Sequence, residues 1–227
     1  MRFFRWVKSI FVKPKPKPPI QPVTTGLNCP SDVAVDYTRL LYGVKVMALP
    51  KNVTELVKKH VHRFKAVADM THVPWQVIAF IAIRETGFDW KKYKKTGELD
   101  FNWHRCLHNG DRWDRVTTHV PSGLGPWTSW ESAAADALNR RRRPSSWNSI
   151  NLLWFLEKYN GLGYRKYHSH VKSPYLWGYT NRYTKGGYKA DGKWSNSYVN
   201  KQIGATAFML HFGLIDIKLT ELSELKK

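Results

Sequence analysis

The stretch Pro74-Trp-Gln-Val-Ile-Ala-Phe-Ile-Ala-Ile-Arg-Glu-Thr-Gly87 predicts the central element of the fold. Proline at the start and glycine at the end are the usual boundaries of a helix. Between them, residues 77–83 are apolar on every side, which is typical of a helix surrounded by the rest of the protein. Helical spacing puts Glu85 on the same face as Ile78 and Ile81. The sequence therefore predicts a buried helix that carries one carboxylate near its carboxyl end.

The carboxylate of Glu85 needs a physical reason to occupy such a helix. In one interpretation, Glu85 forms a structural ion pair with Arg84 or with another basic side chain. In the other, Glu85 is a general acid whose pKa is raised by apolar surroundings. The helix by itself leaves both interpretations open.

The composition limits the class of protein. With 227 residues, the chain is long enough for one domain with a sizeable core and additional terminal segments. Trp, Tyr and Phe make up 14% of the chain, which suits a globular fold with an aromatic-lined groove. The formal net charge is +20, so the protein should be attracted to polyanions such as nucleic acid, anionic lipid and the acidic polymers of the bacterial wall.

The N-terminal residues differ in character from the rest. Residues 1–12 combine apolar and basic side chains on opposite sides of a predicted amphipathic helix, which suits an anionic membrane surface. The segment is too short to span a membrane and has no clear secretory signal. The Lys/Pro-rich residues 13–22 predict either an extended spacer or a disordered basic tail.

Helical signals dominate residues 23–220 and strand signals are weak, so the expected fold class is mainly α. Asn52 is expected to cap one helix that continues to Ala68. Thr128 and Glu131 predict a capping box before a helix over residues 133–140. Further helices are predicted over residues 148–159 and 198–212. Two stretches look irregular: residues 89–126 predict a long structured loop with room for a small hairpin, and residues 164–194 show no regular period.

Cysteine and histidine give little support to disulfide or metal chemistry. Cys29 and Cys106 are too few for a disulfide scaffold, although a protein outside the cytoplasm would permit a bridge between them. The histidines at 104, 108 and 119 lie near Asp111, but their spacing matches no known zinc motif. We therefore expect no metal and no cofactor, and the state of the two cysteines remains open.

Short motifs follow the helix in a fixed order after Arg84-Glu-Thr-Gly87. They are Leu107-His-Asn-Gly-Asp111, Thr118-His-Val-Pro-Ser-Gly123, Gly125-Pro-Trp-Thr-Ser-Trp-Glu-Ser-Ala133, Glu157-Lys-Tyr-Asn-Gly-Leu-Gly-Tyr-Arg165, Ser173-Pro-Tyr-Leu-Trp177 and Tyr183-Thr-Lys-Gly-Gly-Tyr-Lys-Ala-Asp-Gly192. Over about residues 53–204, this series resembles a family of phage and prophage lysozyme-like peptidoglycan hydrolases, many of them called endolysins. It is also similar to the goose-type lysozymes and lytic transglycosylases, whose helix more commonly has serine where this chain has Thr86.

The resemblance implies a lysozyme-like catalytic domain over residues 23–220 that cleaves the glycan backbone of peptidoglycan. It matches Glu85 to the catalytic glutamate of the family. Such a protein would act at the bacterial cell wall, in phage lysis or wall penetration, with peptidoglycan strands as its partner. We expect a monomer that uses residues 1–12 at an anionic membrane and binds no specific nucleic acid.

A second carboxylate depends on the reaction. An inverting hydrolase needs a base about 6.5–9.5 Å from the acid. Asp111 and Asp100, both in the loop after Glu85, are the candidates by position, although an Asx turn next to Gly110 explains Asp111 equally well. A lytic transglycosylase needs no such base, because the 6-hydroxyl of N-acetylmuramic acid attacks intramolecularly. The sequence leaves the two reactions open.

A glycan groove favours flat aromatic platforms and amide groups. The candidate substrate-binding residues are His108, Asn109, Tyr159, Asn160, Tyr175 and Trp177, with Tyr159 and Asn160 resembling a groove segment of lytic transglycosylases. Each has a structural alternative. His108 would hold the loop by hydrogen bonds, Tyr159 would pack at a helix end, and Tyr175 and Trp177 would belong to the core.

Two other functional classes fit parts of the sequence. The net charge and the run Arg140–Arg143 fit a basic nucleic-acid-binding protein, but the basic residues are spread along the chain and no known nucleic-acid motif is found. A metal-dependent amidase or peptidase would act on the same wall. Salt-sensitive DNA binding without lysis would identify the first class, and loss of activity with a chelator would identify the second.

Overall fold

The computed structural model describes residues 26–190 and 192–216 as a mainly helical fold, which confirms the predicted fold class. Its elements in chain order are α1 (Ser31–Leu41), α2 (Lys51–Lys59), α3 (Val61–Thr71), α4 (Trp75–Ile81), η1 (Ala82–Thr86), α5 (Trp90–Thr96), α6 (Trp130–Asn139), α7 (Ser149–Asn160), α8 (Gly163–Tyr167), α9 (Pro174–Trp177), β1 (Gly187–Ala190), β2 (Lys193–Ser195) and α10 (Ala205–His211). The predicted amphipathic helix over residues 1–12 and the Lys/Pro-rich segment over 13–22 lie outside the described residues.

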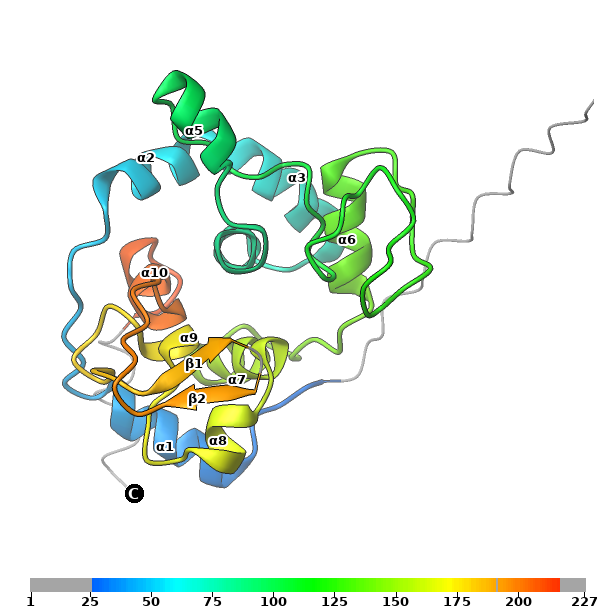
Figure 1. Cartoon of the computed structure of the whole chain (residues 1–227). Helices are drawn as coiled ribbons and strands as arrows, with labels where there is room; N and C mark the ends of the chain where they lie inside the picture. Colours follow the sequence, from blue (N-terminus) through cyan, green and yellow to red (C-terminus); the bar gives the residue numbers. More distant parts are fainter. Residues whose placement is uncertain (1–25, 191, 217–227) are drawn as a thin grey trace, which may run out of the picture.

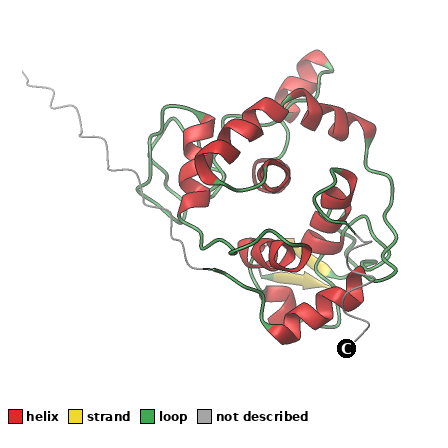
Figure 2. Cartoon of the chain, turned by 180° about the vertical axis from the view of Figure 1, so that it is seen from behind, coloured by secondary structure: helices red, strands yellow, loops and turns green. Residues whose placement is uncertain are grey.

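The helices form two groups around α4. Figure 1 shows α4 end-on in teal near the centre, with α2, α3, α5 and α6 on one side of it. On the other side lie α1, α7, α8, α9, α10 and the antiparallel pair β1–β2, and Figure 2 shows the same division from behind. Contacts of α4 with both α3 and α10 join the groups. The central helix therefore brings residues of both groups to its carboxyl end, where Glu85 lies.

The central helix was predicted to be regular, but its last turn is π-helical. Pro74 precedes α4, and Gly87 ends η1 with a positive φ of 65°. The carbonyl of Ala82 accepts the backbone N–H of Gly87, five residues later, at 3.1 Å and the hydroxyl of Thr86 at 2.7 Å. The bond from the Gly87 N–H spans five residues, as in a π-helix, and the Thr86 hydroxyl shares the same carbonyl as acceptor. Single π turns occur often at functional sites, and this one carries Glu85.

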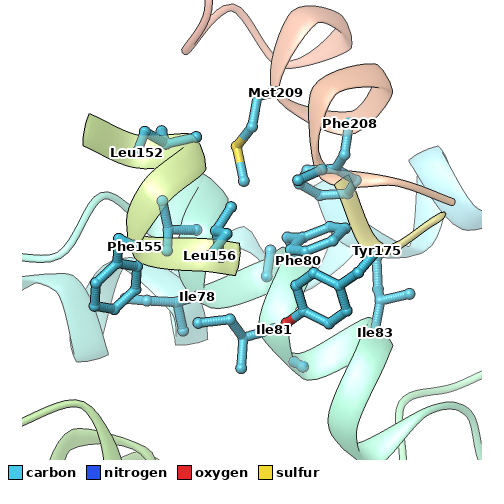
Figure 3. Packing of buried hydrophobic residues seen from close by; sticks show 14 of the residues in the cluster. Ile78, Phe80, Ile81, Ile83, Leu152, Phe155, Leu156, Tyr175, Phe208 and Met209 are labelled. Carbon is cyan, nitrogen blue, oxygen red and sulfur yellow. The ribbon is translucent and has the colours of Figure 1, made fainter. Parts of the chain in front are cut away.

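Apolar packing holds the central helix in place on all sides. Residues 77–82 have no exposed surface. Figure 3 shows Phe80 between Tyr175 of α9 and Phe208 of α10, and the ring centroids lie 5.2 and 5.7 Å away. A fully buried side chain of this size stabilises a fold by about 1.5–3 kcal/mol. The same contacts fix the position of Tyr175, which belongs to the candidate site.

Two glycines let α9 and α10 approach each other closely. The N–H of Gly204, just before α10, donates to the carbonyl of Gly178, just after α9, at 3.1 Å. A Cβ atom on Gly204 would lie 2.4 Å from the backbone nitrogen of Gly178, which is too close for any side chain. This approach keeps α9, and with it Tyr175, against the core.

The predicted helix from Asn52 to Ala68 is in fact two helices. Its first part begins at Lys51 after Pro50, so Asn52 lies inside α2 and does not cap it. The chain breaks at His60, between α2 and α3, where the side chain turns to Asp100 at 3.1 Å and packs against Trp103 at 5.0 Å. A tertiary contact of the histidine thus outweighs the continuous helical pattern.

Other boundaries also differ from the prediction. The capping box of α6 uses Ser129 and Ser132 in place of Thr128 and Glu131, because the Glu131 carboxylate binds Arg63 at 2.5 Å. The predicted helix over 148–159 is confirmed as α7, with Asn148 as its cap. The sequence did not predict α1, α5, α8 or α9, and α10 is shorter than predicted. Within residues 26–190 and 192–216, the one hairpin lies at β1–β2, in a stretch read as irregular, and not in the loop over 89–126.

Two further predictions concern cysteines and membranes. Cys29 and Cys106 are both free thiols, so the described structure contains no bridge between them. In the described part of the chain, no single helix is long and apolar enough to cross a membrane. Only α3 and the α4–η1 segment pass such a test together, as a pair bent by 113°.

Candidate active site

Glu85 lies where the buried helix reaches the surface. Its neighbours Ile83 and Thr86 are buried, whereas the Glu85 side chain is open to solvent on one side. The hydroxyl of Tyr175 donates a hydrogen bond to Glu85 Oε1 at 3.2 Å. Tyr175 itself is 2% exposed and burial raises its pKa well above the ordinary value, so the hydroxyl stays protonated and remains a donor. The carboxylate is thus held from the protein side by one buried tyrosine.

The surroundings of Glu85 raise its pKa. Burial against protein atoms favours the neutral carboxyl and is the largest effect. The hydrogen bond from Tyr175 and the positive charges of Arg84 and Arg141 act in the opposite direction, but they do not outweigh burial. A glutamate that keeps its proton to higher pH is suited to general acid catalysis.

Arg84 does not form the structural ion pair considered from the sequence. None of the ion pairs among the described residues includes Arg84 or Glu85. The Arg84 guanidinium instead donates to the carbonyl of Ile203 at 3.3 Å and lies over the ring of Tyr175, 4.7 Å from its centroid. A simple ion pair with its neighbour therefore does not explain the position of Glu85.

A pocket of about 370 Å³ opens beside Glu85, and we call it the Arg84 pocket. Its walls include Arg84 and Tyr175 from the centre of the fold and Asn160 from the end of α7. The predicted groove residue Asn160 is exposed there. The ring of Tyr188 from β1 closes one side at an angle of 89° to the ring of Tyr164. The predicted residues Asn160 and Tyr175 thus line one pocket, and Tyr175 connects it to Glu85.

Tyr159 lies on the other side of the same helix end. Its hydroxyl donates to the carbonyl of Leu107 at 2.9 Å, which ties the long loop to α7. Arg141 lies over the Tyr159 ring at 4.5 Å and is one of the cations that act on Glu85. Tyr159 therefore supports the loop through Leu107. It also lies close enough to Glu85 for the negative charge of the carboxylate to contribute to its raised pKa.

Asp111 anchors a loop. Its Oδ2 accepts the backbone N–H groups of Thr118 and His119 at 2.8 and 2.9 Å, and its Oδ1 bonds the His119 ring at 2.6 Å. The hydrogen bonds from His119 are the main reason that the pKa of Asp111 falls from 3.8 to about 2. A carboxylate with both oxygens engaged and such a low proton affinity is a poor base for activating water.

Asp100 is an anchor on the far side of the loop. Its Oδ1 accepts the backbone N–H of Phe101 and the indole N–H of Trp103, and its Oδ2 accepts Lys92 at 2.8 Å. Burial raises the pKa of Asp100, but these donors outweigh burial and hold it below its ordinary value. Neither Asp100 nor Asp111 is among the groups that shift the pKa of Glu85, and no other carboxylate of the described residues is either.

Replacing Asp111 by asparagine should loosen the loop without removing a catalytic base. The folded-state pKa of Asp111 is depressed, so its stabilisation is present above about pH 4 and is lost as pH falls towards about 2. The Asp111→Asn variant should therefore unfold at a lower temperature than wild type at neutral pH, with the difference shrinking over that window. Its catalytic rate should fall less than about tenfold, whereas loss of a general base costs about 10²–10⁴-fold.

Thermal unfolding and wall-lysis rates measured at several pH values check this prediction. The exposed carboxylate Asp69 gives a matched control, because Asp69→Asn removes a charge that holds no loop. A rate loss of a hundredfold or more in Asp111→Asn, with normal folding, would instead identify Asp111 as the base.

His108 and Asn109 hold the same loop. The His108 side chain is 4% exposed, bonds Asp136 at 3.0 Å and stacks on Trp127 with 5.1 Å between ring centroids. The Asn109 amide donates to the carbonyls of His119 and Pro121 and accepts the N–H of Asp111. These bonds occupy the groups that were expected to meet a glycan, so their role here is to shape the loop.

Trp177 is buried in the core, and this changes its expected role. It is 2% exposed, and its ring lies 6.5 Å from that of Tyr37. A sugar needs an open aromatic face, which Trp177 does not offer. Tyr175 is equally buried, so it contributes its hydroxyl to Glu85 and not a stacking platform. Both residues follow the core alternative considered from the sequence.

Metal binding has no candidate site in the described part of the chain, where no group of three or more His, Cys, Asp and Glu side chains could hold an ion. Comparison with known proteins finds no matching family model, no matching curated protein and no matching solved structure. The site is therefore interpreted from its own geometry and from the sequence motifs.

Sequence reasoning missed Arg84 as a site residue, and also Arg141, Tyr164 and Tyr188. Arg84 was considered only as a partner of Glu85, and the run containing Arg141 was considered as a feature of a nucleic-acid-binding protein. Tyr164 and Tyr188 lie inside two of the quoted motifs, which was the available signal. Their common pocket depends on how β1 folds over the end of α7, and no local pattern encodes that contact.

Removing the hydroxyl of Tyr175 should raise the pKa of Glu85 further. The hydrogen bond favours the charged carboxylate, so its loss in Tyr175→Phe disfavours that form. A general acid works only while protonated, so the alkaline limb of the pH–rate profile should move to higher pH. Tyr159→Phe is the matched control, because its hydroxyl bonds Leu107 instead. An unchanged or downward-shifted limb in Tyr175→Phe would contradict the assignment.

Proposed function

We propose that this protein cleaves the glycan backbone of peptidoglycan between N-acetylmuramic acid and N-acetylglucosamine, with Glu85 as the general acid. The observation that carries the proposal is a carboxyl group with a raised pKa, open to solvent at the end of a buried helix and held by Tyr175. Such a group can protonate the leaving glycosidic oxygen while positive charge develops at the anomeric carbon. The lysozyme-like fold and a role in phage-type lysis or wall penetration, both implied by the motifs, belong to the same proposal.

The neighbours of Glu85 can stabilise the carboxylate that remains after Glu85 has donated its proton. After the proton leaves, the carboxylate accepts the hydrogen bond from Tyr175 and is stabilised by the charges of Arg84 and Arg141. These groups are already in position, so little reorganisation accompanies the reaction. Burial keeps the acid protonated before the reaction, and the cations stabilise its conjugate base afterwards.

One observation favours the intramolecular route over hydrolysis. The two candidate bases, Asp100 and Asp111, are both engaged by hydrogen bonds that hold the loop. Inverting hydrolysis requires a base to activate water. A lytic transglycosylase requires no second carboxylate. The 6-hydroxyl of N-acetylmuramic acid attacks the anomeric carbon, and its proton passes to the Glu85 carboxylate, which has already given its own proton to the leaving oxygen. We therefore favour transglycosylation, with hydrolysis at the same bond as the alternative.

Mass spectrometry of the products tests both levels of the proposal. Purified peptidoglycan is incubated with the protein, and the soluble fragments are analysed at their saccharide ends. Anhydro-N-acetylmuramic ends are expected, reducing N-acetylmuramic ends would indicate hydrolysis, and reducing N-acetylglucosamine ends would indicate cleavage of the other bond. If no glycan fragment is released from walls of several bacterial types, the proposed function is rejected.

The charge of the chain suits this substrate. With a formal net charge of +20, the protein is attracted to the anionic polymers of bacterial walls, which raises its local concentration there. Screening by salt weakens this attraction, since the Debye length is about 8 Å at physiological ionic strength and shorter at higher salt. The amphipathic residues 1–12 would add attraction to an anionic membrane.

A further inference from the structure

Arg84 is a partly exposed cation whose hydrogen-bonding capacity is only partly used. One terminal nitrogen donates to Ile203, but Nε is buried with no hydrogen-bond partner among the described residues. Burial also lowers the pKa of Arg84, which shows that its surroundings disfavour the charged form. A largely buried charge without an ion-pair partner among the described residues is costly. A negatively charged ligand beside Arg84 would balance it.

The Arg84 pocket has the lining that an acidic amino sugar requires. Its volume of about 370 Å³ lies within the range of about 300–1,000 Å³ that is usual for small-molecule sites. Tyr164 and Tyr188 supply aromatic surface, and the exposed side chain of Asn160 supplies an amide group. The amide of Asn200, which also lines the pocket, is bonded to Gln202. Arg84 is the charged member of the described lining, and no carboxylate in that lining competes for it.

The pocket is directly connected to the candidate general acid. Tyr175 forms part of its wall and donates to Glu85 at 3.2 Å, while its ring lies under the Arg84 guanidinium at 4.7 Å. A sugar in the pocket would therefore contact Tyr175, which is hydrogen-bonded to the candidate proton donor. Of the two sugars in peptidoglycan, only N-acetylmuramic acid carries a lactyl ether, and that ether ends in a carboxyl group.

We propose that the Arg84 pocket binds an N-acetylmuramic acid unit and that Arg84 recognises its lactyl carboxylate. This inference rests on the proposed function and names the sugar that the site selects. The guanidinium can donate charge-assisted hydrogen bonds to a carboxylate, which would balance its positive charge. Asn160 would face the acetamido group, and Tyr164 and Tyr188 would contact the ring.

Calorimetric binding to the full-length Glu85→Gln protein, which cannot consume its ligand, tests the inference. Three tetrasaccharides are compared: alternating N-acetylglucosamine and N-acetylmuramic acid with free lactyl carboxylates, the same sugar with each carboxylate converted to a methylamide, and chitotetraose. A hydrogen bond to a charged group contributes about 1.5–3 kcal/mol, so the free carboxylate should bind about 10–100-fold more tightly than chitotetraose. The methylamide should bind like chitotetraose.

Substitutions then assign the preference to Arg84. Arg84→Met, in the same background, should bind all three sugars with similar affinity, and Arg84→Lys should keep part of the preference because it keeps the charge. Arg39→Met, which makes the same change at an exposed position, should behave like the parent. If Arg84→Met does not fold, as judged by circular dichroism, the comparison of carboxylate with methylamide and the Arg84→Lys variant still decide.

Equal affinity for the carboxylate and methylamide sugars would overturn the inference, as would an unchanged preference in Arg84→Met. Absence of binding by all three sugars would also overturn it. A separate lysis assay of the wild type on purified peptidoglycan distinguishes the two levels of proposal. Carboxylate-dependent binding without glycan cleavage rejects the proposed function, whereas cleavage without carboxylate preference rejects only the role of Arg84.

Discussion

Glu85→Gln should reduce the rate of peptidoglycan cleavage by about 10²–10⁴-fold or more, because an amide cannot donate the proton that a general acid supplies. The substitution keeps the size of the side chain, and its amide oxygen can still accept the hydrogen bond from Tyr175. Loss of turbidity in a suspension of purified wall measures the rate. Near-normal lysis by the variant would remove Glu85 from the mechanism.

The stability of Glu85→Gln separates a catalytic role from a structural one. The pKa of Glu85 is raised in the folded state, so folding favours the protonated carboxyl. The free energy of unfolding of the wild type therefore falls as the pH rises from 4.5 through the raised pKa. Glutamine does not ionise, so the variant does not lose stability in this way. It should be at least as stable as wild type at pH 8, with the difference vanishing at low pH. A structural ion pair would give the opposite result.

Glu131→Gln provides the matched contrast. The Glu131 carboxylate binds Arg63 at 2.5 Å between α6 and α3, and its burial is outweighed by this bond, so its pKa is lowered. Its stabilisation is therefore present at neutral pH. Glu131→Gln should unfold at a lower temperature than wild type and still lyse walls at a normal rate, which is the reverse of the pattern expected for Glu85→Gln. Thermal unfolding and lysis of both variants check the contrast.

The central helix was predictable from sequence because its signals are local. Pro74, Gly87 and the apolar run between them determine where the helix begins, where it ends and that it is buried. The π turn was not predictable, because it depends on the Ala82 carbonyl accepting two donors at once. Functional sites often depart from regular geometry in this way, and local rules fail there first.

The site residues also differ in whether a local sequence signal or a three-dimensional contact determines their role. Glu85 was singled out because a carboxylate at the end of an apolar helix is unusual in any fold, and the downstream motifs favoured the general acid over an ion pair. For Asp111 and His108 the sequence left a loop-supporting role open beside the catalytic or binding one, because a short polar motif does not reveal which groups its side chains will meet. In the structure Asp111 binds Thr118 and His119, and His108 binds Asp136. These contacts favour the loop-supporting role.

Trp177→Ala should strongly destabilise the fold while showing that the indole is no sugar platform. The ring is 2% exposed, and truncation of a buried Trp to Ala costs about 3–5 kcal/mol, because it removes apolar contacts and leaves a cavity. For a chain of this size, each kcal/mol lowers the melting temperature by about 2–4 °C, so a fall of roughly 6–20 °C is expected. Differential scanning calorimetry measures it.

Trp90→Ala is the control, since Trp90 is 58% exposed and its loss should cost about 1 kcal/mol or less. Below its melting temperature, folded Trp177→Ala should bind chitotetraose with an affinity close to that of wild type. A sugar platform would give the converse result, with an unchanged melting temperature and weak binding. Trp177 and Tyr175 both belong to α9, so loss of the indole can displace Tyr175 from Glu85. Any partial loss of lysis in Trp177→Ala should therefore be accompanied by a shift of the pH–rate profile. A lost sugar contact would lower the rate without that shift.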